Sequence, residues 1–138
     1  RPALRVVLDT CVLKLGTFPT RDNPSALVVE LCLRGLLEHW ASPAMLDEYC
    51  SVLGDDPDFL AEFLAAIHIC YPLTALRVIR HEPDNRFLEC ALACEADRLI
   101  TVNTASGHFD RKRYGDVRTT TPGEFVNLDQ VQRLILAL

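Results

Sequence analysis

The feature that most constrains the fold is a short apolar run that ends in one carboxylate. Residues 4–9, LRVVLD, are largely apolar on both faces until the chain reaches Asp9. A strand without a polar face has to be covered on both sides, as strands are in parallel sheets. Asp9 then falls at the carboxyl end of the strand, the edge where α/β sheets bind their ligands. A carboxylate at the mouth of an apolar strand also needs a partner.

Helical and strand patterns alternate along the rest of the chain. Apolar residues at helical spacing predict a helix over residues 25–37, which follows the turn-rich residues 18–25 and has Asn23 or Ser25 as its cap. Ser42 and Pro43 predict the start of the next helix. The other predicted elements are strands over 38–42, 98–102 and 117–121, helices over 44–53, 59–70, 84–96 and 123–127, a partly extended connection over 72–83, and a final helix from Asp129.

This order of elements predicts an α/β fold with a central parallel sheet flanked by helices. Strands that alternate with helices pair in parallel through right-handed crossovers, which leaves few topologies. No internal repeat, low-complexity tract or linker interrupts the pattern. We therefore expect residues 1–138 to form a single domain.

The composition narrows the functional class. Hydrophobic residues make up 49% of the 138 residues, and the net charge of -5 excludes the global basic field that draws proteins onto duplex nucleic acid. No CxxC or histidine pair near the six cysteines completes a zinc site, so we expect reduced thiols. No apolar run reaches the ~18 residues that span a bilayer, and no signal-peptide pattern is present. We expect a cytoplasmic protein with no membrane contact.

Acidic and amide residues recur where the predicted strands end. Asp9 and Asn103 each follow an apolar strand, Asp84 begins a helix, and Glu48 lies one to two turns inside another. Carboxylates that converge repel one another, so they require a cation. Mg²⁺ or Mn²⁺ takes oxygen ligands and leaves positions for water and phosphate, which predicts metal-assisted phosphodiester hydrolysis. Taken singly, Asp84 is also typical of a helix cap and Glu48 of a solvated helix residue.

Four motifs resemble those of the PIN domain family, and in particular its VapC-like ribonucleases, the toxins of toxin–antitoxin pairs. The motifs, in chain order, are VVLDTCVL, SPAMLDEYCSVL, EPDNRFLECALACEADRLITVN and TTPGEF. The resemblance covers nearly the whole chain. It implies a PIN-like domain that cleaves RNA with Mg²⁺ or Mn²⁺ and binds a cognate antitoxin protein.

The resemblance also implies roles for individual residues. Asp9, Glu48 and Asp84 match the carboxylates that bind the metal and carry the catalysis. Asn103 occupies the place of a fourth metal-binding residue, which is usually Asp. A homodimer is common in the family. The Leu- and Val-rich residues 25–37 and the C-terminal helix are candidates either for a homodimer face or for the surface that receives an antitoxin segment.

Two residues depart from the family pattern. Cys11 stands where the family usually has Asn, and Asn103 lacks the charge that would help to hold a second metal ion. Thr10 and Thr101 match small hydroxyl residues that flank the site. The departures leave an alternative open, in which the chain is a catalytically weak or inactive PIN-like module that binds RNA or a protein partner.

Residues outside the four motifs suggest weaker hypotheses. Glu89 is a secondary candidate for the acidic edge, although a salt-bridged helix residue is also expected there. Arg111, Lys112 and Arg113 form the tightest basic cluster, which predicts either RNA phosphate contacts or a solvated loop. His108 is isolated in sequence, so we expect a structural or exposed side chain.

A receiver domain also has an Asp at the end of its first strand. That class requires an additional acidic pair after the strand and a lysine at the end of a later strand. Asp9 stands alone here and Lys112 falls in a loop, so the receiver hypothesis is disfavoured.

Overall fold

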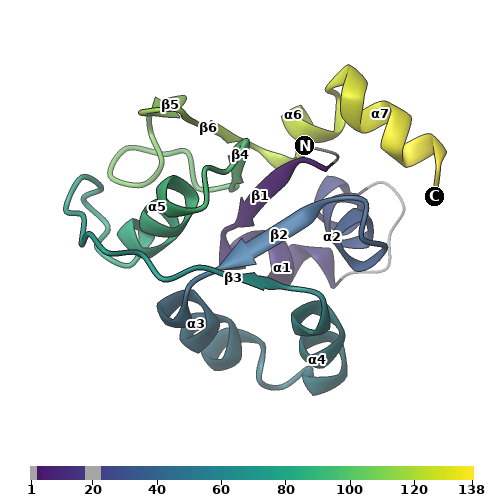
Figure 1. Ribbon diagram of the computed structural model, residues 1–138, viewed down its shortest axis with the longest axis horizontal. Helices are drawn as coiled ribbons and strands as arrows, with labels where there is room; N and C mark the ends of the chain where they lie inside the picture. Colours follow the sequence, from purple (N-terminus) through teal and green to yellow (C-terminus); the bar gives the residue numbers. More distant parts are fainter. Residues whose placement is uncertain (1–2, 18–22) are drawn as a thin grey trace.

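The computed structural model describes residues 3–17 and 23–138, so residues 18–22 of the turn-rich patch lie outside the described residues. The elements, in chain order, are β1 (Arg5–Leu8), α1 (Thr10–Gly16), α2 (Pro24–Leu33), β2 (Glu38–Ala41), α3 (Pro43–Leu53), α4 (Pro57–Ala65), β3 (His68–Ile69), α5 (Asp84–Ala93), β4 (Arg98–Ile100), β5 (Arg113–Tyr114), β6 (Val117–Thr120), α6 (Pro122–Val126) and α7 (Asp129–Leu136). Figure 1 shows their arrangement.

The described strands form one sheet of six strands in the order β3-β2-β1-β4-β6-β5. β1 pairs in parallel with β2 on one side and with β4 on the other, and the register aligns Leu8 with Ile100. β3 and β6 extend the sheet in parallel, whereas β5 pairs antiparallel with β6. The α/β class with a mainly parallel sheet flanked by helices is therefore confirmed.

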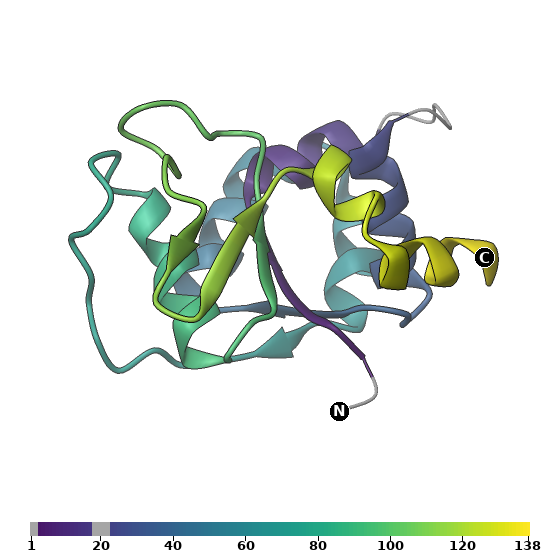
Figure 2. The ribbon, with the colours of Figure 1, turned by 90° about the horizontal axis from the view of Figure 1, so that it is seen from above.

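Helices cover both faces of the apolar central strands. The side chains of Val6, Val7 and Ile100 are fully buried. α5 packs against β1, β2 and β4, while Figure 2 shows α2, α4 and α7 on the other side of the sheet. Burial on both faces is the physical reason that residues 4–9 lack a polar face.

The predicted helix starts are confirmed by their caps. The Asn23 side chain accepts a hydrogen bond from the backbone N–H of Ser25, so Asn23 is the cap of α2. Ser42 caps α3 by accepting from the backbone N–H of Met45 at 3.3 Å. Each cap satisfies a backbone donor that has no partner within its own helix.

Local predictions were wrong where apolar residues run across an element boundary. Residues 10–16 form α1, although they were not predicted to be a helix. The helix predicted over 59–70 ends at Ala65, and His68 and Ile69 form β3 instead. The helix predicted to reach residue 37 ends at Leu33, followed by Gly35 at a φ of 72°. No helix in the described part of the chain is long and apolar enough to cross a bilayer.

Candidate metal and catalytic site

Asp9 lies at the carboxyl end of β1 with its side chain turned toward β4. Its backbone N–H donates to the carbonyl of Ile100 at 2.9 Å, and its Oδ2 accepts from the hydroxyl of Thr101 at 2.7 Å. Asp9 is the N-cap residue of α1, yet its side chain makes no capping hydrogen bond. The carboxylate is only 4% exposed and is held at the sheet edge by Thr101.

The surroundings of Asp9 favour its neutral form. Burial raises the pKa of Asp9 above its ordinary value of 3.8, and the nearby charges of Asp84 and Glu48 raise it further. Hydrogen bonds from Thr101 and Cys11 oppose that shift. A bound cation would offset the effects of burial and of the neighbouring negative charges, because it favours the ionised form of Asp9.

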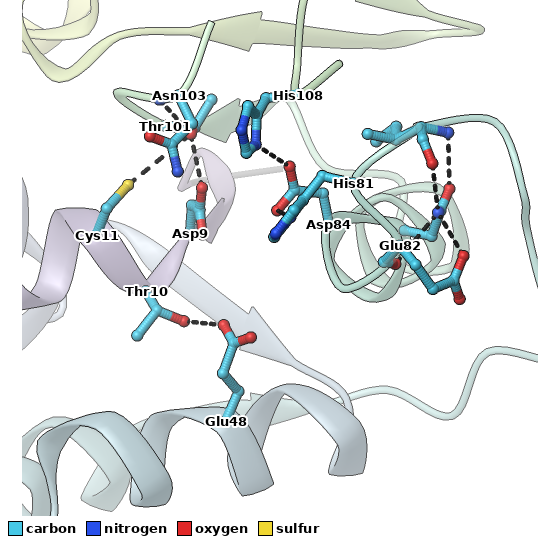
Figure 3. A network of polar contacts seen from close by, with 12 residues as sticks. Asp9, Thr10, Cys11, Glu48, His81, Glu82, Asp84, Thr101, Asn103 and His108 are labelled. Carbon is cyan, nitrogen blue, oxygen red and sulfur yellow. Dashed lines mark hydrogen bonds and ion pairs between the residues drawn. The ribbon is translucent and has the colours of Figure 1, made fainter. Parts of the chain in front are cut away.

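Glu48 reaches the same edge from α3. The hydroxyl of Thr10 donates a hydrogen bond to Oε2 of Glu48, which lies across from Asp9 in Figure 3. The neighbouring Tyr49 is buried, and its hydroxyl donates to the carbonyl of Leu8 at the end of β1. This contact fixes the rotation of α3 about its axis, so that Glu48 faces the end of β1.

Asp84 is the first residue of α5, but its side chain does not cap the helix. Its Oδ1 lies 3.2 Å from Nδ1 of His81, and its Oδ2 lies 2.9 Å from Nδ1 of His108. Figure 3 shows both imidazoles beside this carboxylate, and the centroids of the two rings lie only 4.6 Å apart. The Asp84 side chain is 5% exposed, whereas His81 and His108 are 51% and 33% exposed. The two histidines therefore lie between a buried carboxylate and solvent.

Backbone contacts hold the two histidine-bearing segments together. The backbone N–H of His81 donates to the carbonyl of Gly107 at 2.8 Å. Gly107 has a φ of 89°, a conformation that glycine adopts without strain, and it places His108 against Asp84. Asn85 is fully buried and anchors the preceding chain: its Oδ1 accepts from the backbone N–H groups of Val78 and Ile79 at 3.0 and 2.9 Å.

The ligand atoms at this edge are not all equally close. Among the described residues, the group whose donor atoms all lie within 4.8 Å of one another is His81, Asp84 and His108. Asp9 and Glu48 share the edge with Asp84, as the electrostatic effect of both charges on Asp9 shows, but they are not part of that close group. The sequence pattern did not single out His81 or Asn85.

The departures from the family pattern also lie beside Asp9. The Cys11 sulfur is 3.9 Å from the Thr101 hydroxyl, and burial together with the charge of Asp9 raises the pKa of the thiol to about 11. The thiol is therefore neutral at pH 7. Asn103 is beside Thr101 in Figure 3, and its backbone N–H donates to the Thr101 hydroxyl at 2.9 Å. Thr101 thus connects Asp9, Cys11 and Asn103.

Glu89 is committed to contacts away from Asp9. Its Oε2 accepts from the backbone N–H of Leu76 and from the guanidinium of Arg86, both at 2.7 Å. These bonds attach the irregular chain before α5 to the helix itself. The structure therefore places Glu89 in the salt-bridged role rather than beside Asp9.

The predicted basic cluster borders the site through one of its members. Arg111, Arg77 and Arg80 line a polar pocket of about 270 Å³ together with His108. Lys112 and Arg111 also line a groove of about 550 Å³ near β6. Arg113 is exposed in β5. The positive charge beside His108 thus comes from Arg111 and from Arg77 and Arg80, which the sequence pattern did not indicate.

Comparison with protein families identifies the class. A PIN domain family model matches residues 5–105, and the chain belongs to this family. PIN domains are generally nucleases that act on RNA and use divalent metal ions. No curated protein and no solved structure gives a significant match. The oxygen-rich set of Asp9, Glu48, Asp84 and Asn103 fits a hard divalent cation.

Proposed function

We propose that this protein is a Mg²⁺- or Mn²⁺-dependent endoribonuclease and the toxin of a toxin–antitoxin pair. The observation that carries the nuclease proposal is the buried carboxylate of Asp9, which has Asp84 and Glu48 as charged neighbours. A carboxylate in such surroundings is costly to ionise without a cation. Membership of the PIN domain family supports the same conclusion.

The residues of the site have separate roles in this proposal. Asp9, Glu48 and Asp84 hold the metal, with Asn103 as a further oxygen ligand, and the bound ion would activate water and offset the charge of the phosphate. Thr101 fixes the orientation of Asp9 through its 2.7 Å hydrogen bond. Thr10 does the same for Glu48. Both carboxylates are thereby oriented before substrate binds, which favours catalysis.

RNA approaches the acidic edge from its basic border. Arg77, Arg80 and Arg111 line the polar pocket that includes His108, the neighbour of Asp84. Guanidinium groups contact phosphate oxygens without reading sequence. In the proposed complex, they bind the RNA backbone beside the scissile phosphate, together with Lys112 and Arg113 from the same basic segment.

The toxin role rests on the resemblance of the four motifs to VapC-like ribonucleases. An antitoxin segment would cover the acidic edge and exclude RNA. A homodimer through α2 and α7 is a further part of the proposal. Val28, Val29 and Leu31 of α2 are buried in the core of the chain itself, whereas Leu136 of α7 is 87% exposed. α7 therefore offers more free apolar surface to a second copy than α2 does.

A cleavage assay with single-stranded RNA tests the nuclease proposal. With Mn²⁺ or Mg²⁺ the wild type should cleave RNA, and EDTA should abolish the reaction. Asp9→Asn and Glu48→Gln should each reduce the rate by at least about a hundredfold. Asp47→Asn is the matched control, because Asp47 adjoins Glu48 on α3 but is exposed. Equal rates in the wild type and Asp9→Asn would contradict the proposal.

The second candidate function is a weak or inactive PIN-like module that binds RNA or a protein. Cys11 and Asn103 favour it. Cys11 puts a neutral thiol, a weak hydrogen-bonding group, where the family has an amide, and Asn103 lacks the negative charge of the usual Asp. This function would be identified if the wild type and Asp9→Asn bound RNA with equal affinity and the wild type did not cleave the RNA in the presence of Mn²⁺.

A further inference from the structure

We propose that His81, Asp84 and His108 form a metal site of two imidazoles and one carboxylate that selects an imidazole-preferring divalent ion of the class of Co²⁺, Ni²⁺ and Zn²⁺ over Mg²⁺. This site shares Asp84 with the proposed nuclease centre. Its metal binding does not depend on RNA cleavage, so the two proposals can fail separately.

The distances in this group fit a coordination shell. Asp84 Oδ1 lies 3.2 Å from His81 Nδ1, and Asp84 Oδ2 lies 2.9 Å from His108 Nδ1. Ligands that each lie about 2.1 Å from an ion are about 3.0 to 3.4 Å apart in octahedral or tetrahedral geometry. All three donor atoms are also within 4.8 Å of one another. Two ligands of one such ion are at most about 4.2 Å apart, so the metal would draw the two imidazoles toward one shared position beside Asp84.

The site is built from chain segments that other contacts already hold in place. Asn85 fastens the chain that leads to His81, and the 2.8 Å hydrogen bond from the His81 N–H to Gly107 joins this chain to the loop that carries His108. The His108 N–H donates to Ala105 at 3.0 Å within that loop. Donors fixed in this way bind a metal with little ordering cost.

The three proposed ligands differ in their exposure to solvent. The Asp84 carboxylate is almost completely buried, and the described structure gives it the two histidines as close polar partners. The partly exposed imidazoles leave the opposite side of a bound ion open to water or to a phosphate from the neighbouring arginine pocket. An open position distinguishes catalytic from purely structural metal sites.

The types of ligand determine the metal. Mg²⁺ requires oxygen ligands and near-ideal octahedral geometry, whereas imidazole nitrogen suits Co²⁺, Ni²⁺ and Zn²⁺. Two imidazoles on one carboxylate therefore favour the latter class. A simple hydrogen-bonded clamp, in which both imidazoles only orient Asp84, is the competing explanation. The two explanations differ in what happens when imidazole is replaced by another hydrogen-bond donor.

A titration with Co²⁺ alone, followed by its visible absorption, separates these explanations. All proteins should carry Cys50→Ser, because Cys50 is an exposed thiol and could bind Co²⁺ itself. The test variants are His81→Gln and His108→Gln, since glutamine can still donate to Asp84 but is a poor ligand for this class of ion. His68→Gln is the matched control, because His68 stacks on Trp40 and is exposed in the edge strand β3, which β2 and β1 separate from β4.

The proposal predicts that His81→Gln and His108→Gln each weaken Co²⁺ binding at least about tenfold. His68→Gln should bind as the parent does, and excess Mg²⁺ should not displace the Co²⁺. Equal Co²⁺ affinity in the parent and in both test variants, at unchanged unfolding midpoints, would overturn the proposal. Histidine-dependent Co²⁺ binding in a protein that cleaves no RNA would support this site and contradict only the proposed nuclease function.

Discussion

The hydroxyl of Thr101 donates a 2.7 Å hydrogen bond to the carboxylate of Asp9 and thereby joins the carboxyl ends of β1 and β4. The same hydroxyl accepts from the backbone N–H of Asn103 at 2.9 Å. Thr101 is fully buried and Asp9 is only 4% exposed, so water has little access to the carboxylate if the hydroxyl is lost. The hydroxyl that directly follows β4 thus helps to orient the central carboxylate.

Replacing Thr101 by valine should therefore destabilise the protein. Thr101→Val keeps the shape of the side chain but removes the donor to Asp9 and the acceptor for Asn103. We expect the free energy of unfolding in urea to fall by about 1–3 kcal/mol. Thr104→Val, at an exposed position on the following loop, should change it by less than about 0.5 kcal/mol. Equal stability of both variants would mean that the hydroxyl does not hold the site.

Replacing Asp9 by asparagine should stabilise the metal-free protein at neutral pH. Because burial raises the pKa of Asp9, the folded state retains a proton that the unfolded state loses as pH rises above 3.8. The free energy of unfolding of the wild type therefore falls through that window and stays lower above it. The Asp9→Asn variant has no carboxyl group to ionise, so its free energy of unfolding does not fall in this way. Its amide oxygen can still accept the hydrogen bond from Thr101.

Thermal unfolding in EDTA measures this effect. At pH 7 the midpoint should be higher for Asp9→Asn than for the wild type, and the difference should disappear below pH 3.8, where Asp9 is protonated in both states. Mg²⁺ or Mn²⁺ should raise the midpoint of the wild type more than that of the variant. A variant that is less stable than the wild type at pH 7 would contradict the electrostatic account.

Asn85→Ala should loosen the chain that carries His81. The substitution removes the acceptor for the backbone N–H groups of Val78 and Ile79 and a donor to the Ile79 carbonyl. Several buried polar groups then lose their partner, so we expect a loss of about 3 kcal/mol or more in stability. Hydrogen exchange should quicken at Val78 and Ile79. Asn127→Ala, in the exposed cap after α6, should leave those amides protected.

Arg111→Ala should weaken the binding of RNA, measured in the absence of divalent metal ions. If Arg111 contacts one phosphate of single-stranded RNA, its loss should reduce the slope of log affinity against log salt by about 0.7. Fluorescence anisotropy with a labelled oligonucleotide measures both quantities. Arg133→Ala removes the same charge from exposed α7 and should leave the slope unchanged. Identical slopes for the two variants would remove Arg111 from the RNA interface.

The strands at the centre of the sheet were predictable because they are buried on both faces. Residues 4–9 and 98–102 are compact apolar runs, and Ser42 is a clear cap signal. α1 was missed because its apolar residues directly continue the apolar strand, with no side-chain cap between them. β3 was missed because IHIC extends the helical apolar pattern beyond Ala65.

The site was predictable only in part, for a similar physical reason. Asp9 stands out because an acidic residue ends an apolar strand. His81 and His108 carry no local signal, since each is an isolated histidine in an irregular segment. Their contact with Asp84 arises only when the loop through Gly107 folds back on the start of α5. No spacing of residues in the sequence predicts that this loop contacts the start of α5.

The most direct test of the acidic centre is a crystal of the full chain soaked in Mn²⁺ and measured at the manganese absorption edge. The proposed function predicts an anomalous peak within about 2.5 Å of carboxylate oxygens of Asp9 and Asp84, with Glu48 beside it, and the absence of this peak in Asp9→Asn crystals. A wild-type crystal at millimolar Mn²⁺ with no peak at coordination distance from Asp9 would contradict it.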